Sequence, residues 1–249
     1  MPLSVVSVIP LEGLPELEPE DDLGLLLHGA ATAVGGLEDG DVVVVAQKAV
    51  SKVEGRVVSI EDVEPSARAV ELAGPDGDPR HLELILRESA EVVRSRPPLV
   101  ITETRHGFVC ASAGVDASNT PGDDLLVLLP LDPDESARRL RVRLGELSGA
   151  DVGVIVSDSF GRAWRQGTTD VALGVAGIAP VRDLRGTSDA RGRELKTTQI
   201  AVADELAGAA ELVMGKSRGV PAAVVRGVDA RGDGSASELV MPRERDLFR

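Results

Sequence analysis

The chain has 249 residues, which is long for one small domain but ordinary for one large domain or two interwoven smaller ones. Aromatic residues make up only 2% of it, with no tyrosine and Trp164 as the single tryptophan, which excludes a site built on aromatic stacking, such as a platform for single-stranded nucleic acid. The 41 acidic and 27 basic residues give a formal net charge of −14, which repels nucleic acid and anionic membranes and excludes both as expected partners.

The chain predicts a mixed α/β fold, because apolar runs typical of strands alternate with helical patterns. The strand-like runs lie at 3–9, 41–46, 99–102, 108–111, 125–129, 152–156 and 222–225. The clearest helical patterns lie at 21–34, 80–95, 134–148 and 194–214. Segments rich in Gly, Pro and Asp predict loops at 73–79, 119–124, 182–193 and 229–235. None of these loops has the character of a linker, so we expect residues 1–249 to form a single unit.

The first 22 residues contain no basic segment and no apolar stretch long enough for a signal peptide or a membrane span. We therefore expect a cytoplasmic protein. The single cysteine, Cys110, excludes an internal disulfide and a cysteine-rich metal site, and a small buried hydrophobe explains it better than a reactive thiol.

Two motifs resemble known sites but lack residues that those sites require. VMGKS at 213–217 ends like a phosphate-binding P-loop, but Ala210 stands where the first glycine belongs, and a helical pattern precedes the motif instead of following it. DARGDGSASELV at 229–240 resembles a calcium loop, but Arg231 and Val240 occupy ligand positions.

A serine hydrolase is also disfavoured. Ser159 lies in no nucleophile elbow, and the three histidines, His28, His81 and His106, fall in helical patterns or a turn where surface or core roles explain them.

Two segments, GFVCASAGVDASN and VGVIVSDSFGR, share one design. In each, an apolar run ends in a small-residue turn that carries an aspartate, Asp116 in the first and Asp158 in the second. Asn119 follows one aspartate and Ser159 the other, and Gly161 is expected to let the chain turn away just beyond the strand. Such oxygen ligands suit Mg²⁺ or Mn²⁺ with a bound phosphate. Turn-forming aspartates are the alternative, and the residues alone support the two interpretations equally.

A third segment, DVVVVAQKAVSKVEGR, runs from a strand into Lys48 and Lys52, with Arg56 beyond. A lysine ammonium is a compact charge suited to a triphosphate, although surface lysines need no explanation. Lysine is rare in this chain, with Lys196 and Lys216 as the other two.

Seven motifs in order along residues 7–228 resemble the coenzyme F420:γ-glutamyl ligase family: IPLEGLPEL, AQKAVSKVEGR, AGVDASN, LLPLDPDESA, VGVIVSDSFGRAWRQG, GRELKTTQIAVADELA and LVMGKSRGVPAAVVRG. The resemblance implies a GTP-dependent ligase that forms an amide bond between L-glutamate and the coenzyme F420 precursor and then adds γ-linked glutamates. It implies a mixed α/β fold of two interwoven subdomains in an intertwined, butterfly-like homodimer. It also implies Mg²⁺ or Mn²⁺, with two ions expected, and a helpful effect of K⁺.

The resemblance also implies roles for individual residues. Asp116 and Asp158 fall on catalytic metal-ligand positions, and Ser159 falls on an adjacent metal-ligand position. The nucleotide-contacting positions correspond to Leu14, Pro15, Glu16, Leu17, Gln47, Lys48, Lys52, Asn119, Met214, Gly215, Lys216, Ser217, Arg218, Gly219 and Val220. Arg162 and Arg165 are candidates for holding a substrate carboxylate or phosphate, with surface arginine as the equal alternative.

One departure concerns the loop after residue 214. Some family members carry an acid there, a possible third metal position, whereas this chain has Lys216, which can meet phosphates directly. Some members also carry a second, reductase-like domain, which we do not expect here. Two other functions remain open: a metal-dependent GTP phosphohydrolase, and a module that binds GTP without turnover.

Overall fold

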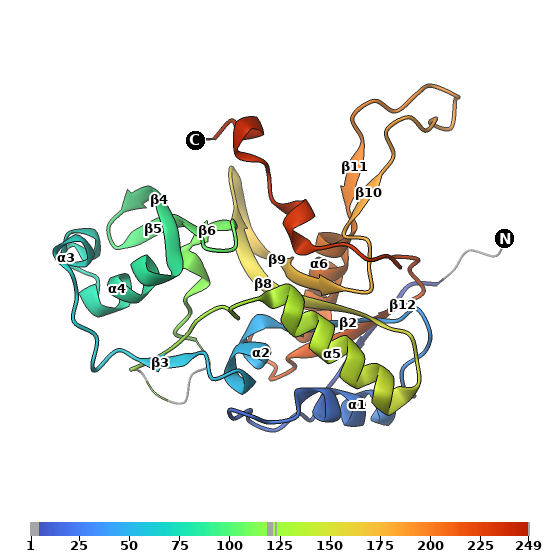
Figure 1. The fold of residues 1–249 in the computed structure, drawn as a ribbon, viewed down its shortest axis with the longest axis horizontal. Coiled ribbons are helices and arrows are strands. Elements are labelled where there is room, and N and C mark those ends of the chain that lie inside the picture. The colour runs from blue at the N-terminus through green and yellow to red at the C-terminus, as the bar shows by residue number, and fades with distance from the viewer. Residues whose placement is uncertain (1–4, 119–121, 123, 249) are drawn as a thin grey trace.

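The computed structural model describes residues 5–118, 122 and 124–248, and its centre is a five-stranded sheet with the order β1-β12-β2-β8-β9 (Figure 1). In that order the strands span Ser7–Pro10, Ala222–Arg226, Val42–Ala46, Gly153–Arg162 and Arg165–Ala176. The pair β2–β8 is parallel, and the other neighbours in this sheet are antiparallel. The predicted mixed α/β fold is confirmed.

Helices cover both faces of this sheet. One face packs against α1 (Leu23–Ala33), α2 (Gln47–Val53) and α5 (Pro133–Ser148), and the other against α6 (Val202–Met214). The run Val42–Val45 in β2 shows why the strand is apolar throughout: successive side chains point to opposite faces, and both faces are buried.

Residues 57–118, 122 and 124–128 form a second region, which we call the small lobe, at the left of Figure 1. Its own hydrophobic cluster includes Leu82, Ile85, Val100 and Leu126. Its elements are β3 (Val57–Ser59), α3 (Ala67–Ala73), α4 (Pro79–Glu88), β4 (Ser89–Arg96), β5 (Leu99–Thr104), β6 (Val109–Ala111), a 3-10 turn at Ser112–Gly114, and β7 (Leu125–Val127). The strands pair as β4-β5-β6 and as β3-β7.

A hairpin of β10 (Val181–Asp183) and β11 (Gln199–Ala201) projects from the body at the upper right of Figure 1. The last described residues form two short 3-10 turns, Ala236–Leu239 and Arg243–Arg245. In the part of the chain that the structure describes, no helix combines the length and the apolar character needed to cross a membrane.

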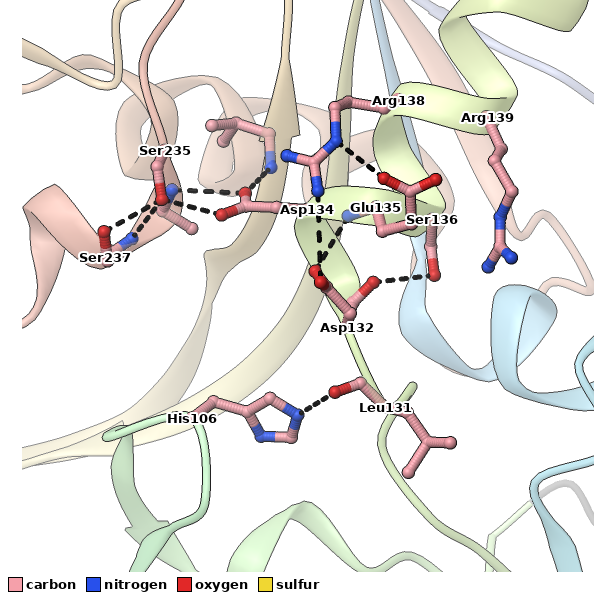
Figure 2. A network of polar contacts seen from close by, with 12 residues as sticks. His106, Leu131, Asp132, Asp134, Glu135, Ser136, Arg138, Arg139, Ser235 and Ser237 are labelled. Carbon is pink, nitrogen blue, oxygen red and sulfur yellow. Dashed lines mark hydrogen bonds and ion pairs between the residues drawn. The ribbon is translucent and has the colours of Figure 1, made fainter.

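Polar contacts at the start of α5 tie three parts of the molecule together (Figure 2). The carboxylate of Asp134 accepts hydrogen bonds from the backbone N–H of Val175 in β9 at 2.7 Å and from Ser235 Oγ at 2.7 Å. His106 of the small lobe donates from Nε2 to the backbone carbonyl of Leu131 at 3.1 Å. These contacts fix β9, the C-terminal segment and the small lobe relative to α5.

Two predicted helices are too long. The pattern at 80–95 becomes strand β4 after Glu88, because Ser89–Arg96 pairs with β5, and the pattern at 194–214 becomes helical only at Val202, because Gln199–Ala201 pairs with β10. In both segments pairing with a neighbouring strand overrides local helical periodicity.

One predicted strand is too short. The run at 152–156 continues as β8 to Arg162, so Gly161 lies inside the strand and is not the point where the chain turns away. The predicted loop at 182–193 begins with two residues of β10. The predicted strands at 41–46, 99–102, 108–111, 125–129 and 222–225 and the helices at 21–34 and 134–148 are confirmed within a few residues.

Candidate active site

A cavity of about 720 Å³ lies where β2 ends and α2 begins. The parallel pairing of β2 with β8 stops at Ala46 and Ser157, so β8 continues beyond that point with β9 as its remaining partner in the sheet. Most of the residues predicted for the site line this cavity: Leu14, Pro15, Glu16, Leu17, Gln47, Lys48, Lys52, Asp158, Ser159, Met214, Gly215, Lys216, Ser217, Gly219 and Val220. Four segments distant in sequence therefore meet here.

Two of the lysines that line the cavity, Lys48 and Lys52, lie on helix α2, directly after the end of β2. Four residues separate them, so they share one face of the helix. Lys48 Nζ lies 2.7 Å from the Asp116 carboxylate and also contacts Ser118 Oγ, while Lys52 Nζ is paired with Glu16. The helix thus brings two ammonium groups to the same wall.

Gln47, the first residue of α2, contributes a buried amide. Its side chain is only 1% exposed, and its Oε1 accepts a hydrogen bond from Ser51 Oγ at 3.0 Å. Its Nε2 is buried without a hydrogen-bond partner among the described residues, although the residue lines the cavity. A buried donor left unpaired costs about 1–3 kcal/mol, so this amide is a candidate to bind a polar ligand atom.

The small lobe supplies Asp116. Its backbone forms a bridge with Val127, with N–H to O distances of 3.0 and 2.8 Å in the two directions. Burial alone would raise the pKa of Asp116, but hydrogen bonds from Lys48 and from the backbone N–H of Ser118, at 2.7 Å, outweigh it and hold the pKa below its ordinary value. Asp116 is therefore an anion at neutral pH, and it reaches the cavity wall through Lys48.

The sheet supplies Asp158, whose environment raises its pKa, whereas that of Asp116 is lowered. Burial raises its pKa to about 7, the backbone N–H of Ser159 opposes that rise, and the negative charges of Asp116 and Asp170 add to it. Lys216 offsets only part of this effect. A carboxylate held among other carboxylates is the electrostatic environment that a cation stabilises.

Ser159 and Asp170 form a hydrogen-bonded pair across β8 and β9. Ser159 Oγ donates to Asp170 Oδ1 at 2.6 Å, and Ser157 Oγ donates to Asp170 Oδ2 at 2.9 Å. The Asp170 side chain is nearly fully buried and lines the cavity.

The donor set fits a magnesium-like cation. Two carboxylates, Asp116 and Asp158, and the hydroxyl of Ser159 are hard oxygen groups, and Mg²⁺ commonly takes one or two carboxylates and completes its shell with water and phosphate. Across residues 5–118, 122 and 124–248, no three His, Cys, Asp or Glu side chains form a cluster that would hold a metal by itself. Any ion would therefore depend on bound phosphate for part of its coordination.

Not every predicted residue lines the cavity. Asp116 and Arg218 do not, although Asp116 is paired with the lining residue Lys48, and Asn119 lies outside the described residues. Arg162 and Arg165 pair with each other at the exposed tip of the β8–β9 hairpin, and Arg162 is about 13 Å along the strand from Asp158. In this chain the two arginines are not brought to the aspartates.

Sequence reasoning missed three polar lining residues, Ser157, Asp170 and Glu211. The sequence does contain a signal for Asp170, because this residue directly precedes the apolar run VALGVA. Interpreting that run as a strand would have placed Asp170 beside it. Glu211 lies in the helical pattern before the Met-Gly loop, where nothing local distinguishes it from a solvated helix residue.

Cys110 and the histidines agree with their predicted structural roles. The Cys110 side chain is buried, and burial together with the charge of Asp158 raises the pKa of its thiol to about 12. His106 stacks on Phe108, and His28 and His81 lie in α1 and α4.

Comparison with known proteins shows the family of this chain. The family model described as "F420-0:Gamma-glutamyl ligase" matches residues 13–227. The "Coenzyme F420:L-glutamate ligase" of Methanothermobacter thermautotrophicus is 46% identical over 98% of this chain and 99% of its own. The proteins of the same name from Methanopyrus kandleri and Archaeoglobus fulgidus are 45% and 44% identical, over 100% and 98% of this chain and 99% and 96% of theirs. The chain therefore belongs to the F420-0:gamma-glutamyl ligase family and is an enzyme of the ligase class.

Proposed function

We propose that this chain joins L-glutamate to the coenzyme F420 precursor through an amide bond and then adds γ-linked glutamates, with GTP as the energy source. The names of the relatives support the substrates. The observation that carries the nucleotide assignment is the cavity itself, a space of about 720 Å³ lined by the lysines of α2 and by most of the loop from Met214 to Val220. Gln47 lines it too, and its Nε2 has no hydrogen-bond partner among the described residues.

The charges suit a triphosphate. Lys48 and Lys52 on α2 and Lys216 after the end of α6 all line the cavity, so a polyphosphate bound there can meet ammonium groups from two segments of the chain. This local arrangement is needed because the protein is strongly acidic and every proposed substrate is an anion.

The reaction then follows in two steps. A carboxylate oxygen of the deazaflavin precursor attacks the γ-phosphorus of GTP, the bond to the β-phosphate oxygen breaks, and GDP leaves. The glutamate amine attacks the resulting acyl phosphate, the acyl C–O bond breaks, and phosphate and a proton are released. Positioning and charge neutralisation supply most of the catalysis in phosphoryl transfer.

Asp116, Asp158 and Ser159 are the residues that we propose to hold Mg²⁺ or Mn²⁺. Bound there, a divalent ion neutralises phosphate charge and polarises the transferred phosphoryl group. The chain's own contribution is to hold carboxylates of two separate regions near each other: Asp158 of the sheet lines the cavity, and Asp116 of the small lobe is paired with the lining residue Lys48.

We also expect the homodimer that the family resemblance implies, which light scattering tests. The resemblance further implies activation by K⁺, which activity assays with exchanged salts test.

A mass measurement separates this function from its alternatives. Purified protein is mixed with GTP, Mg²⁺, L-glutamate and the deazaflavin precursor, and we expect product masses that increase by whole glutamyl units. A GTP phosphohydrolase would release phosphate at the same rate when glutamate is omitted, and a non-catalytic binding module would release none. Absence of any glutamyl product under these conditions would refute the ligase assignment.

A further inference from the structure

Asp170 is a buried carboxylate with two hydroxyl partners, and it forms no ion pair among the residues that the structure describes. Only 5% of the residue is exposed, and its oxygens accept hydrogen bonds from Ser159 Oγ at 2.6 Å and Ser157 Oγ at 2.9 Å. A buried carboxylate is costly unless it is well solvated by donors, so these contacts hold it in place.

The register of the sheet creates this contact. Asp170 lies directly opposite Ser159 in the β8–β9 ladder, and an irregularity between Val156 and Ser157 leaves Leu173 without a partner in the register. Such bulges shift the facing of side chains, and they concentrate next to functional sites. The bulge therefore decides that an acid, and not an apolar residue, faces Ser159.

The contact determines what Ser159 can do. A serine hydroxyl has one hydrogen to donate and two lone pairs with which to accept. Asp170 takes the hydrogen, so the part of Ser159 Oγ that remains for the cavity is its lone-pair side. An oxygen so oriented is prepared to bind a cation and cannot donate to a phosphate.

The side chain of Asp158 has a different position from that of Ser159. Side chains alternate along β8: Val156 packs in the cluster with α5, and Ile155 packs in the cluster with α6. Asp158 follows the parity of Val156, and Ser159 follows that of Ile155. Asp170 is thus bonded to Ser159 and not to Asp158, and the two proposed oxygen ligands leave opposite faces of one strand.

We infer that Asp170 is a positioning residue that fixes Ser159 Oγ as an acceptor for a divalent cation in the cavity. This inference rests on the proposed function, because it assumes a metal–nucleotide complex at this site. Asp170 contributes through Ser159 and does not touch the ion.

The test uses Mn²⁺ as the probe. Mn²⁺ is titrated into the full-length protein in the presence of GDP, free Mn²⁺ is measured by electron paramagnetic resonance, and GDP binding is measured separately in a chelator. Partners that orient a metal ligand typically contribute about 10–100-fold to metal affinity. We expect Asp170→Asn to weaken Mn²⁺ binding by at least about tenfold, with metal-free GDP binding unchanged.

Asp204→Asn is the matched control. Asp204 is also an acid against β9, where it accepts a hydrogen bond from the Ala172 N–H at 2.9 Å, but it does not line the cavity. We expect its Mn²⁺ affinity to equal that of the wild type. Circular dichroism and thermal unfolding check each variant, and Asp170→Ser, whose shorter side chain cannot reach Ser159 at the same distance, replaces Asp170→Asn if that variant does not fold.

A double-mutant cycle separates positioning from direct coordination. If Asp170 acts through Ser159, the variant with both Ser159→Ala and Asp170→Asn binds Mn²⁺ no more weakly than Ser159→Ala alone. Effects that multiply would show that Asp170 acts independently of Ser159, and unchanged affinity in both Asp170→Asn and Asp170→Ser would show that Asp170 does not position Ser159 for the ion. Either result overturns the inference alone, whereas a wild-type protein that binds no Mn²⁺ with GDP would overturn the proposed metal site and this inference with it.

Discussion

Along its length, β8 has two halves with different neighbours. Residues 153–157 pair with β2 on one side, residues 154–157 also pair with β9 on the other, and all five are buried. Residues 158–162 pair with β9, have no pairing with β2, and approach β6 of the small lobe. The first half is apolar up to Ser157, and the second carries Asp158 and Ser159.

The difference shows how a site can be built on a rigid element. Where a strand is enclosed by neighbours, its side chains must be apolar to be buried without cost. Where one neighbour ends, the same strand keeps its direction but gains open space on one side, so polar groups can be held there with little freedom. The following predictions test whether the two halves separate stability from chemistry in this way.

The largest effect is expected for Asp158→Asn in the second half. The substitution removes the charge with almost no change in shape, so we expect glutamyl ligation to fall by at least about 1,000-fold while the fold is retained. Product mass analysis and circular dichroism measure the two properties. Ligation at the wild-type rate would remove Asp158 from the site.

Cys110 on β6 tests how well the small lobe covers the second half. Its thiol pKa is raised to about 12, so we expect native protein at about pH 8 to react with an aromatic disulfide at least about 100-fold more slowly than unfolded protein. The pKa of the thiol is 9.0 in the unfolded chain and about 12 in the folded chain. Its contribution to the free energy of unfolding is therefore complete below pH 9.0 and decreases as the pH rises toward 12.

A fast native reaction of Cys110 would show that β6 does not seal this side. Asp158→Asn should increase the native rate, because the charge of Asp158 contributes to the raised pKa of the thiol.

In the first half, Ile155→Ala is expected to lower the free energy of unfolding by at least about 2 kcal/mol, since Ile155 is fully buried in the cluster with α6. Ile155→Val, which removes one methyl group, should cost about 0.5–1.5 kcal/mol. Urea unfolding measures both. If folded Ile155→Ala ligated glutamate much more slowly than the folded wild-type protein, this result would contradict the proposed separation of the two halves.

The smallest effect is expected for a lysine of helix α2 that lines the cavity. Lys48→Ala should raise the KM for GTP by about tenfold, in line with the loss of one charge-assisted contact of about 1.5 kcal/mol. Lys196→Ala is the control, because that lysine is exposed on the projecting β10–β11 hairpin. Equal KM values for both variants would show that Lys48 does not meet the nucleotide.

The mixed α/β class and the central strands could be predicted because their signals are local. A run such as VVVV can be buried on both faces only in a covered sheet. The prediction that Asp158 lies in a turn at a strand end is wrong, because β8 continues through it to Arg162. Strand β4 and the true start of α6 could not be predicted, because their periodicity fits a helix and only a neighbouring strand makes them different.

By itself, the sequence determined the fold class, the acidic character of the protein and the residue types of the site, since each depends on composition or on short patterns. Only the tertiary structure decided that Lys48 pairs with Asp116 of the small lobe, and that β8 continues past its parallel partner. The same holds for the bulge that sets Asp170 opposite Ser159. These features depend on where segments distant in sequence meet, and no local pattern encodes how far one strand extends beyond its neighbour.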